Sequence, residues 1–330
     1  MRILILSDRR PGHYRQSEAI AAAIARFRPV DIARMDLTIP RLLPRALVTR
    51  LARLLPPQLY LRLVHGLAPE AFPPADLIVS AGALTFGANI ALRRLRGTPN
   101  VIAGSLRGLD PGHVSLVLLP YEHARNLPNH ACLPKPAAID PGALPRPRQW
   151  PGLAAAGGLC IGVLIGGTSQ TATFKPADWN RLVALLSKLA AANLVVKIAT
   201  SPRTPDDAYR ALEDVARLPG VEFIDFRTAG AGTAGEIFRA DVILVTIDSM
   251  SMISEAVAAQ RPTVALAPAM TQRWRDTEII ETLERQDFLR TLPLETGDLP
   301  ALDVFLKTIK PMTENHLDKL ATTVLDRTGL

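Results

Sequence analysis

The sequence predicts an α/β protein with two domains, each a parallel sheet covered by helices. Short apolar runs alternate with amphipathic stretches along the 330 residues, as strands alternate with helices in a parallel sheet. The chain is too long for one small core, and a stretch with six prolines, residues 133–151, interrupts the pattern near the middle. We therefore expect two Rossmann-like domains that face each other across a cleft.

The elements follow from the position of each apolar run. The first half is expected to have strands at 3–7, 76–80, 100–103 and 116–119, and helices ending near residue 27, starting at Pro44 and ending near residue 95. The second half is expected to have five strands, at 159–165, 194–199, 220–225, 242–247 and 262–267, a helix at 176–192 and a helical tail at 302–330. A glycine-containing turn, residues 8–16, is expected to follow the first strand.

Composition indicates a globular protein, with 48% hydrophobic and 21% charged residues. The longest apolar runs are much shorter than the roughly 20 residues that span a bilayer, and the apolar segment at the N-terminus is too brief for a signal peptide. We expect a cytoplasmic protein, with peripheral association at the inner face of the membrane left open. Cys132, Cys160 and the six histidines lack metal-ligand spacing, so no metal site is expected.

Positive charge is concentrated in the first half. Residues 1–150 contain 20 Arg and Lys against 9 Asp and Glu, a balance of +11, whereas the remainder has 18 against 22, a balance of −4. A basic half usually faces an anionic partner, although arginine used at ordinary solvated positions gives the same balance. Few aromatic residues and no recognition motif argue against nucleic acid as the partner.

Residues 37–69 contain no acidic side chain. They contain five arginines, at 41, 45, 50, 53 and 62, together with His65. Leucines at 43, 47, 51 and 54 have helical spacing. One interpretation is an amphipathic helix on an anionic membrane surface, with arginine stems covering apolar surface and guanidinium groups at the headgroups. The other is a helix pair packed on the core with a solvated arginine face.

The most informative stretch is 242–256, a buried strand followed by a helix start. Asp248, Ser249 and Ser251 lie where that helix begins, and such side chains cap helix N-termini. With Asp248 as the N-cap, the next amides would be free to bind phosphate. Glu255, about two turns on, could then hold a pair of sugar hydroxyls. The alternative is an ordinary capped junction with an exposed glutamate.

Three other strand ends carry candidate ligand groups. Gly12 and His13 follow the first strand. Glycine there lets the backbone approach a ligand closely, and the His13 imidazole could act as a base or as a hydrogen-bond donor to phosphate. The alternative is that His13 is a solvated turn residue. The remaining candidates follow the strands at 159–165 and 194–199: Gly166, Gly167, Thr168, Ser201, Arg203 and Thr204.

These motifs together resemble one known family. Pro11-Gly-His-x-x-Gln16, Gly166-Gly-Thr168, Ser201-x-Arg-Thr-Pro205 and the long motif at 246–256 are similar to those of bacterial glycosyltransferase-like proteins related to the plant elongate-mitochondria fission factor. The resemblance covers most of the chain. It implies a GT-B fold with an acceptor domain at 1–150, a nucleotide-sugar domain at 151–310, and a terminal helix at 311–330 that packs back on the first domain.

The resemblance also implies roles for these residues. Residues 249–251 would bind the donor diphosphate, with Asp248 beside them, and Glu255 would hold the ribose. Residues 166–168 would lie beside the diphosphate or sugar, and Ser201, Arg203 and Thr204 would contact phosphate or base. Gly12 and His13 resemble the first loop of lipid-intermediate GlcNAc transferases, which makes Gly12 a candidate donor-binding residue and His13 a candidate base for the acceptor hydroxyl. No cofactor and no obligatory metal are implied.

Three functions remain open at this point. The first is transfer of a sugar from a nucleotide-sugar to an envelope glycan or lipid-linked acceptor. The second is a non-catalytic adaptor at a membrane surface, because the plant relatives are associated with recruiting fission machinery. The third is epimerisation of a nucleotide-sugar, which the GT-B fold also hosts.

Overall fold

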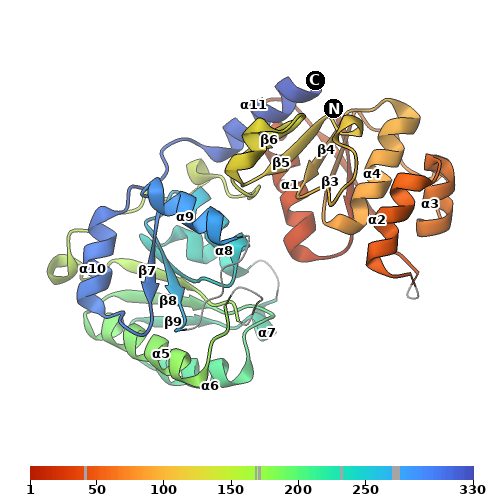
Figure 1. Cartoon of the computed structure of the whole chain (residues 1–330). Helices are drawn as coiled ribbons and strands as arrows, with labels where there is room; N and C mark the ends of the chain where they lie inside the picture. Colours follow the sequence, from red (N-terminus) through yellow and green to blue (C-terminus); the bar gives the residue numbers. More distant parts are fainter. Residues whose placement is uncertain (41–42, 168, 170–171, 231–232, 270–275) are drawn as a thin grey trace. The chain divides into compact units, whose positions relative to one another are not determined.

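The computed structural model describes residues 1–330 apart from 41–42, 168, 170–171, 231–232 and 270–275. The chain divides into two compact units (Figure 1). The first unit comprises Met1–Ile139 and Asn315–Leu330, and the second comprises Asp140–Glu314. The proline-rich stretch therefore contains the boundary, so we describe each unit separately.

The first unit is built on a six-stranded parallel sheet in the order β2-β1-β3-β4-β5-β6. Its strands are β1 (Arg2–Ser7), β2 (Asp31–Asp36), β3 (Leu77–Ala81), β4 (Asn100–Ala103), β5 (Leu116–Leu119) and β6 (His130–Cys132). Its helices are α1 (Pro11–Ala25), α2 (Arg45–Leu54), α3 (Pro57–His65), α4 (Ala83–Arg96) and α11 (His316–Thr328).

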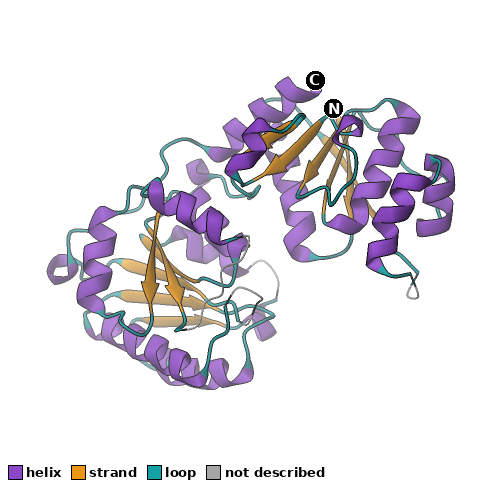
Figure 2. Cartoon of the chain, in the orientation of Figure 1, coloured by secondary structure: helices purple, strands orange, loops and turns teal. Residues whose placement is uncertain are grey.

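Helices cover both faces of this sheet (Figure 2). Successive side chains of a strand point to opposite faces, and β1 shows this directly. Ile3 and Ile5 pack in a core with α1 and α11, whereas Leu4 and Leu6 pack in a core with α2, α3 and α4. Burial on both faces explains why β1 is a continuous apolar run and not an alternating one.

The second unit repeats this plan with a sheet in the order β12-β11-β10-β7-β8-β9, also parallel throughout. Its strands are β7 (Cys160–Leu164), β8 (Val195–Ala199), β9 (Val221–Ile224), β10 (Val242–Thr246), β11 (Thr263–Ala267) and β12 (Leu289–Pro293). Its helices are α5 (Pro176–Ala191), α6 (Asp206–Ala216), α7 (Phe226–Ala229), α8 (Met250–Ala258), α9 (Thr277–Arg285) and α10 (Leu299–Thr308).

The part of the proline-rich stretch that follows Ile139 is fixed to the second unit by polar contacts. The Arg148 guanidinium pairs with Asp241 at 2.8 Å, and the indole N–H of Trp150 donates to Asp303 at 2.8 Å. Burial raises the pKa of Asp241, but hydrogen bonds from the Arg148 side chain and from the Cys160 amide, together with the charge of Arg148, bring this pKa below its usual value. These contacts hold the entry to β7 in place.

The strands predicted from apolar runs are confirmed to within a residue or two, but three strands were missed. These are β2, β6 and β12, so the second sheet has six strands and the prediction of five is wrong. All three lie at sheet edges. Edge strands are short or carry charged side chains, as in Asp31-Ile-Ala-Arg-Met-Asp36, and they therefore lack the apolar run that marks a buried strand.

The predicted turn at residues 8–16 is also wrong in its extent. Helix α1 already begins at Pro11, with Arg10 as its N-cap residue. Proline favours the first helical position because its fixed φ suits a helix and it has no N–H to leave unpaired. Gly12 and His13 consequently lie in the first turn of a helix.

The terminal helix returns to the first unit, as predicted. Leu317, Leu320 and Val324 of α11 are buried beside Ile20 and Ile24 of α1. The Arg26 guanidinium bonds to Asp318 at 2.6 Å at the edge of this contact.

Among the described residues, no helix is both long and apolar enough to cross a membrane.

We expect Leu320→Ala to lower the free energy of unfolding of the first unit by about 2–5 kcal/mol, because a buried leucine leaves a cavity as well as losing its burial. Leu320 is only 3% exposed. Urea denaturation followed by far-ultraviolet circular dichroism measures the change. Asp326→Ala, on the exposed face of the same helix, is the matched control and should change stability by less than about 0.5 kcal/mol. Equal effects of the two substitutions would contradict this packing.

Candidate functional site

Each sheet contains one place where the order of its strands reverses. In the first unit the chain runs from β1 outward to β2 and then returns to add β3 on the other side of β1. In the second unit it runs from β7 through β8 to β9 and then returns to add β10 beside β7. Ligands bind at such reversal points in open parallel sheets, beyond the carboxyl ends of the strands. The residues after β1, β3, β7 and β10 are therefore the ones to inspect.

An aspartate–histidine pair lies at the reversal point of the first unit. Asp8 follows β1, and its Oδ2 lies 2.8 Å from Nδ1 of His13 in the first turn of α1. The Asp8 side chain is 2% exposed and that of His13 is 33% exposed. A carboxylate partner favours the tautomer with the proton on Nδ1. The other ring nitrogen, Nε2, is then able to accept a proton.

Asp8 remains ionised despite its burial. Burial raises the pKa of this carboxyl, but the hydrogen bond and charge of His13, together with the Arg10 amide, bring the pKa below its ordinary value. The Arg10 N–H donates to Oδ1 at 3.2 Å. Asp8 was not among the residues predicted from sequence. Its position directly after a buried strand and five residues before His13 is the signal that could have identified it.

Gly82 completes this group from the neighbouring strand, β3. It has φ +94°, and a Cβ there would overlap His13 Nδ1 and lie 2.8 Å from Asp8 Oδ2. Glycine is therefore required both by its backbone angle and by the approach of the pair. Gly82 was also missed by the sequence prediction, which singled out Gly12. Gly12 is exposed, and its carbonyl accepts a hydrogen bond from the Gln16 side chain at 2.7 Å.

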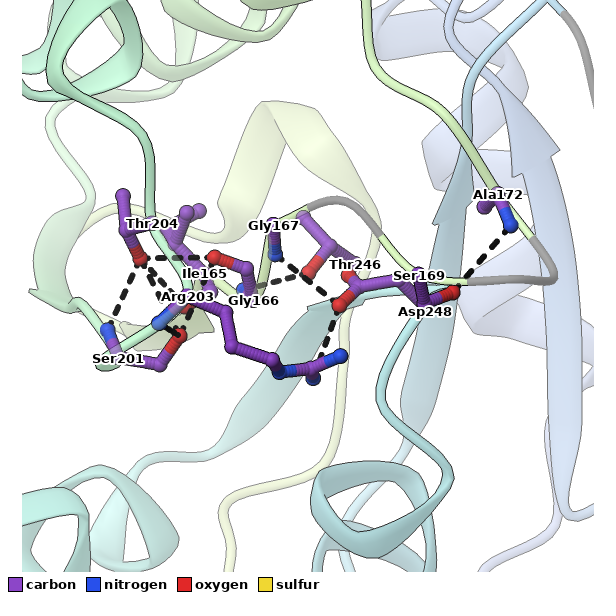
Figure 3. Close-up of polar contacts among 10 residues, drawn as sticks. All are labelled: Ile165, Gly166, Gly167, Ser169, Ala172, Ser201, Arg203, Thr204, Thr246 and Asp248. Atoms are coloured by element: carbon purple, nitrogen blue, oxygen red, sulfur yellow. Dashed lines mark hydrogen bonds and ion pairs between the residues drawn. The ribbon is translucent and has the colours of Figure 1, made fainter.

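The reversal point of the second unit brings together most of the predicted donor-binding residues (Figure 3). The Gly166 N–H donates to Thr246 Oγ1 at 2.7 Å, and the Gly167 N–H donates to Asp248 Oδ2 at 3.0 Å. The glycine loop after β7 is therefore tied to the end of β10. Thr168 lies outside the described residues, so its predicted role stays a prediction.

Asp248 does not cap α8, contrary to the sequence prediction. The N-cap residue is Ser249, and its side chain makes no capping hydrogen bond. The Asp248 carboxylate instead pairs with the Arg203 guanidinium at 2.9 Å, with side-chain exposures of 0% and 43% respectively. Burial raises the pKa of Asp248, although the charge of Arg203 opposes the shift. Asp248 thus holds Arg203 in place, while Arg203 reaches solvent.

The start of α8 retains its capacity to bind an anion. Its first intrahelical hydrogen bond runs from the Ile253 N–H to the Ser249 carbonyl, and the amides before Ile253 have no helical carbonyl to bond. These amides belong to Met250, Ser251 and Met252. The Ser249 N–H, which was predicted to be free, donates to the Thr246 carbonyl at 3.3 Å. Ser251 is exposed and Ser249 is 7% exposed. Glu255 lies farther along the same helix and is partly exposed.

Ser201 and Thr204 hold the loop after β8 against the end of β7. The Thr204 hydroxyl donates to the Gly166 carbonyl at 2.7 Å, and the Ser201 hydroxyl donates to the same carbonyl at 3.2 Å. The Ser201 N–H bonds in turn to Thr204 Oγ1 at 2.9 Å. These contacts position Arg203 between the two hydroxyl residues. Of the three residues predicted to contact phosphate or base, Arg203 is the one whose side chain reaches solvent, because Ser201 and Thr204 are buried.

The two glycines of the loop after β7 are required by packing. A Cβ on Gly166 would lie 2.7 Å from Asp248 Cγ, and a Cβ on Gly167 would overlap the Arg203 carbonyl and lie 2.6 Å from its carbon. Both values are well below van der Waals contact. Without a Cβ, Gly166 leaves room for the Asp248 carboxylate and Gly167 leaves room for the Arg203 backbone. These two contacts set the position of the Arg203 guanidinium.

Comparison with known proteins assigns the family. The sequence model of the family described as Mitochondrial fission ELM1 matches residues 11–327. The chain belongs to this family. The resemblance to the plant elongate-mitochondria fission factor is thereby confirmed. No curated protein sequence matches the chain.

Solved structures show that this ELM1-family chain has a GT-B fold. It is similar to the glycotransferase of kitacinnamycin, with 14% identity, coverage of 99% of this chain and 95% of the other, and a TM-score of 0.55. It is also similar to Acinetobacter baumannii MurG, with 12% identity, 98% and 94% coverage and a TM-score of 0.53. The UDP-GlcNAc 2-epimerase of Methanocaldococcus jannaschii, solved in complex with UDP-GlcNAc and UDP, gives 11% identity, 98% and 99% coverage and a TM-score of 0.50.

Within the part of the chain that the structure describes, no group of three or more His, Cys, Asp or Glu side chains is placed to hold a metal ion. Metal independence of the chain remains a prediction. In each of the pairs Asp8–His13 and Asp248–Arg203, a buried carboxylate lies against one nitrogen-bearing side chain. This chemistry suits proton transfer and anion binding.

We expect Gly167→Ala to lower the free energy of unfolding of the second unit by about 1–3 kcal/mol, because the added methyl group must displace the Arg203 backbone. Trp150 and Trp179 both lie in this unit, so urea denaturation followed by tryptophan fluorescence reports on it. The control is Gly235→Ala in the same unit, where a Cβ would meet nothing within 4 Å. If Gly167→Ala is as stable as this control, the close contact is absent.

Proposed function

We propose that this protein transfers a sugar from a nucleotide-sugar to a glycan or lipid-linked acceptor. The observation that carries the proposal is the anion site of the second unit, where Arg203 and the first amides of α8 lie at the reversal point of the sheet. A diphosphate needs charge-assisted donors of this kind. The kinship in fold with an epimerase solved with UDP-GlcNAc and UDP makes uridine nucleotides the first ligands to test.

In this proposal the second unit binds the donor. Arg203 and the amides of α8 would stabilise the negative charge that develops on the departing diphosphate. Ser249 and Ser251 would add hydroxyl donors, Glu255 would take the ribose hydroxyls, and Gly166, Gly167 and Thr168 would lie beside the diphosphate or the sugar. Asp248 would act as a positioning residue for Arg203, since its own side chain is fully buried.

The first unit supplies the base in this proposal. His13 Nε2 would accept the proton of the acceptor hydroxyl as the sugar is transferred. Asp8 would fix the tautomer and orientation of His13, and its negative charge would stabilise the imidazolium that forms. Gly12, in the first turn of α1, would allow the acceptor to approach the backbone. No metal takes part in the proposed reaction.

A donor-binding test addresses the second unit alone. We expect UDP-sugars to raise the melting temperature of the wild type, because a ligand that binds the native state stabilises it. Arg203→Ala should weaken binding by about tenfold or more, through loss of charge-assisted hydrogen bonds, and Glu255→Ala should abolish the shift. Arg217→Ala, which removes an exposed arginine of the same unit, is the control. A wild type that responds to no nucleotide-sugar would falsify donor binding.

A kinetic test addresses the first unit. We expect His13→Ala to slow donor turnover by about 100-fold or more, the usual contribution of a general base, while the nucleotide-induced melting shift is retained. Asp8→Asn should slow turnover by a smaller factor. The exposed pair Asp110 and His113 in the same unit offers matched controls, Asp110→Asn and His113→Ala, which should leave the rate unchanged. Equal rates for all four variants and the wild type would exclude His13 as the base.

Two other functions have specific support. The family description concerns mitochondrial fission, which favours a membrane-surface adaptor with this fold and without turnover. The likeness to an epimerase favours inversion of a nucleotide-sugar without an acceptor. Product analysis after incubation with donor alone distinguishes the three, since an epimerase gives a new nucleotide-sugar, a transferase gives slow hydrolysis and an adaptor gives neither.

A further inference from the structure

Helices α2 and α3 expose leucine and arginine side chains together. Leu54 is 72% exposed, Leu63 is 59%, Leu59 is 42% and Leu47 is 38%. Both helices pack against α4 at one side of the first unit (Figure 1). With three exposed arginines they form what we call the leucine–arginine surface: Leu47, Arg50, Arg53, Leu54, Leu59, Arg62 and Leu63.

These leucines are not needed for the core. Helices α2 and α3 already fill the core with other residues, namely Val48, Tyr60, Leu61 and Val64, each at most 1% exposed. The sequence pattern had grouped the leucines at 43, 47, 51 and 54 into one apolar stripe. The structure divides them, because Leu43 and Leu51 pack on the core whereas Leu47 and Leu54 face solvent. Four exposed leucines on two helices that contact each other indicate an interaction surface.

The arginines of this surface have no carboxylate partner. Across the described residues, no ion pair involves Arg50, Arg53 or Arg62, whereas Arg2 pairs with Asp76 and Arg125 pairs with Glu122. No acidic residue occurs in the sequence from 37 to 69. The positive charge of this surface is therefore uncompensated. Arg41 and the side chain of Arg45, also expected to contribute, lie outside the described residues.

We propose that the leucine–arginine surface seats the first unit on an anionic membrane. Leucines would enter the boundary between headgroups and acyl chains, and the guanidinium groups would bind lipid phosphates. The uncompensated positive charge favours an anionic partner, and the exposed leucines favour one that also takes up apolar side chains, as the boundary of a membrane does. The inference does not depend on the proposed sugar transfer.

Vesicle co-sedimentation of the full chain tests this surface. We expect binding to phosphatidylcholine vesicles that contain phosphatidylglycerol, weaker binding to phosphatidylcholine alone, and release as salt screens the charges. The double variant Leu54→Ser/Leu63→Ser and the triple variant Arg50→Gln/Arg53→Gln/Arg62→Gln should each lower partitioning by about tenfold or more. Leu127→Ser and Arg217→Gln, exposed residues outside this surface, should not.

Three outcomes would overturn the proposal: no vesicle binding by the wild type, equal binding by the wild type and both variants, or a dimer in light scattering that the leucine variant dissociates. The last would assign the surface to a second copy of this chain. Circular dichroism checks the fold of each variant. If the leucine variant is unfolded, vesicle binding by the arginine variant alone tests the proposal. The melting shift with UDP-sugars should be the same in all variants, which separates failure here from failure of donor binding.

Discussion

The reversal of strand order in each sheet is the constraint on which the candidate site depends. Because β3 returns to the side of β1 away from β2, and β10 returns to the side of β7 away from β8, the helices after these strands diverge and leave their N-termini and loops accessible. The two reversal points differ in chemistry. The first presents an imidazole held by a carboxylate, and the second presents a guanidinium held by a carboxylate.

Close packing at these points decides which residues are tolerated. Gly82 lies against the Asp8–His13 pair, Gly166 against Asp248 and Gly167 against the Arg203 backbone. In each case a missing Cβ lets a polar group approach the end of a strand. Glycines in such loops often leave room for a ligand, but here the three glycines leave room for other residues of the protein. Their effect on a ligand is therefore indirect, through the position of His13 and Arg203.

Much of the fold follows from the sequence because buried strands such as β1, β3, β7 and β10 must be apolar on both faces. Edge strand β2 could not be predicted this way, since its side chains are partly solvated and charged. The residues at the start of α8 were predicted from capping chemistry, but the predicted role of Asp248 as the N-cap is wrong. Its partner Arg203 is 45 residues away in sequence, and only the sheet brings the two together. Gly82 was missed because only the sheet brings it against the Asp8–His13 pair, whereas Asp8 could have been identified from its position after a buried strand and five residues before His13.

The burial of Asp8 and Asp248 favours chemistry over a purely structural role. Taking a carboxylate out of water is costly unless it is paired and hydrogen-bonded, and apolar side chains could fill either position with less penalty. Both carboxylates are at most 2% exposed, and each is paired with a side chain that remains one third to two fifths exposed. A binding scaffold needs an exposed surface such as that of α2 and α3, and it gains nothing from orienting an imidazole and a guanidinium toward solvent at two separate reversal points. The proposed sugar transfer would use both, the imidazole to remove a proton and the guanidinium to stabilise the departing diphosphate.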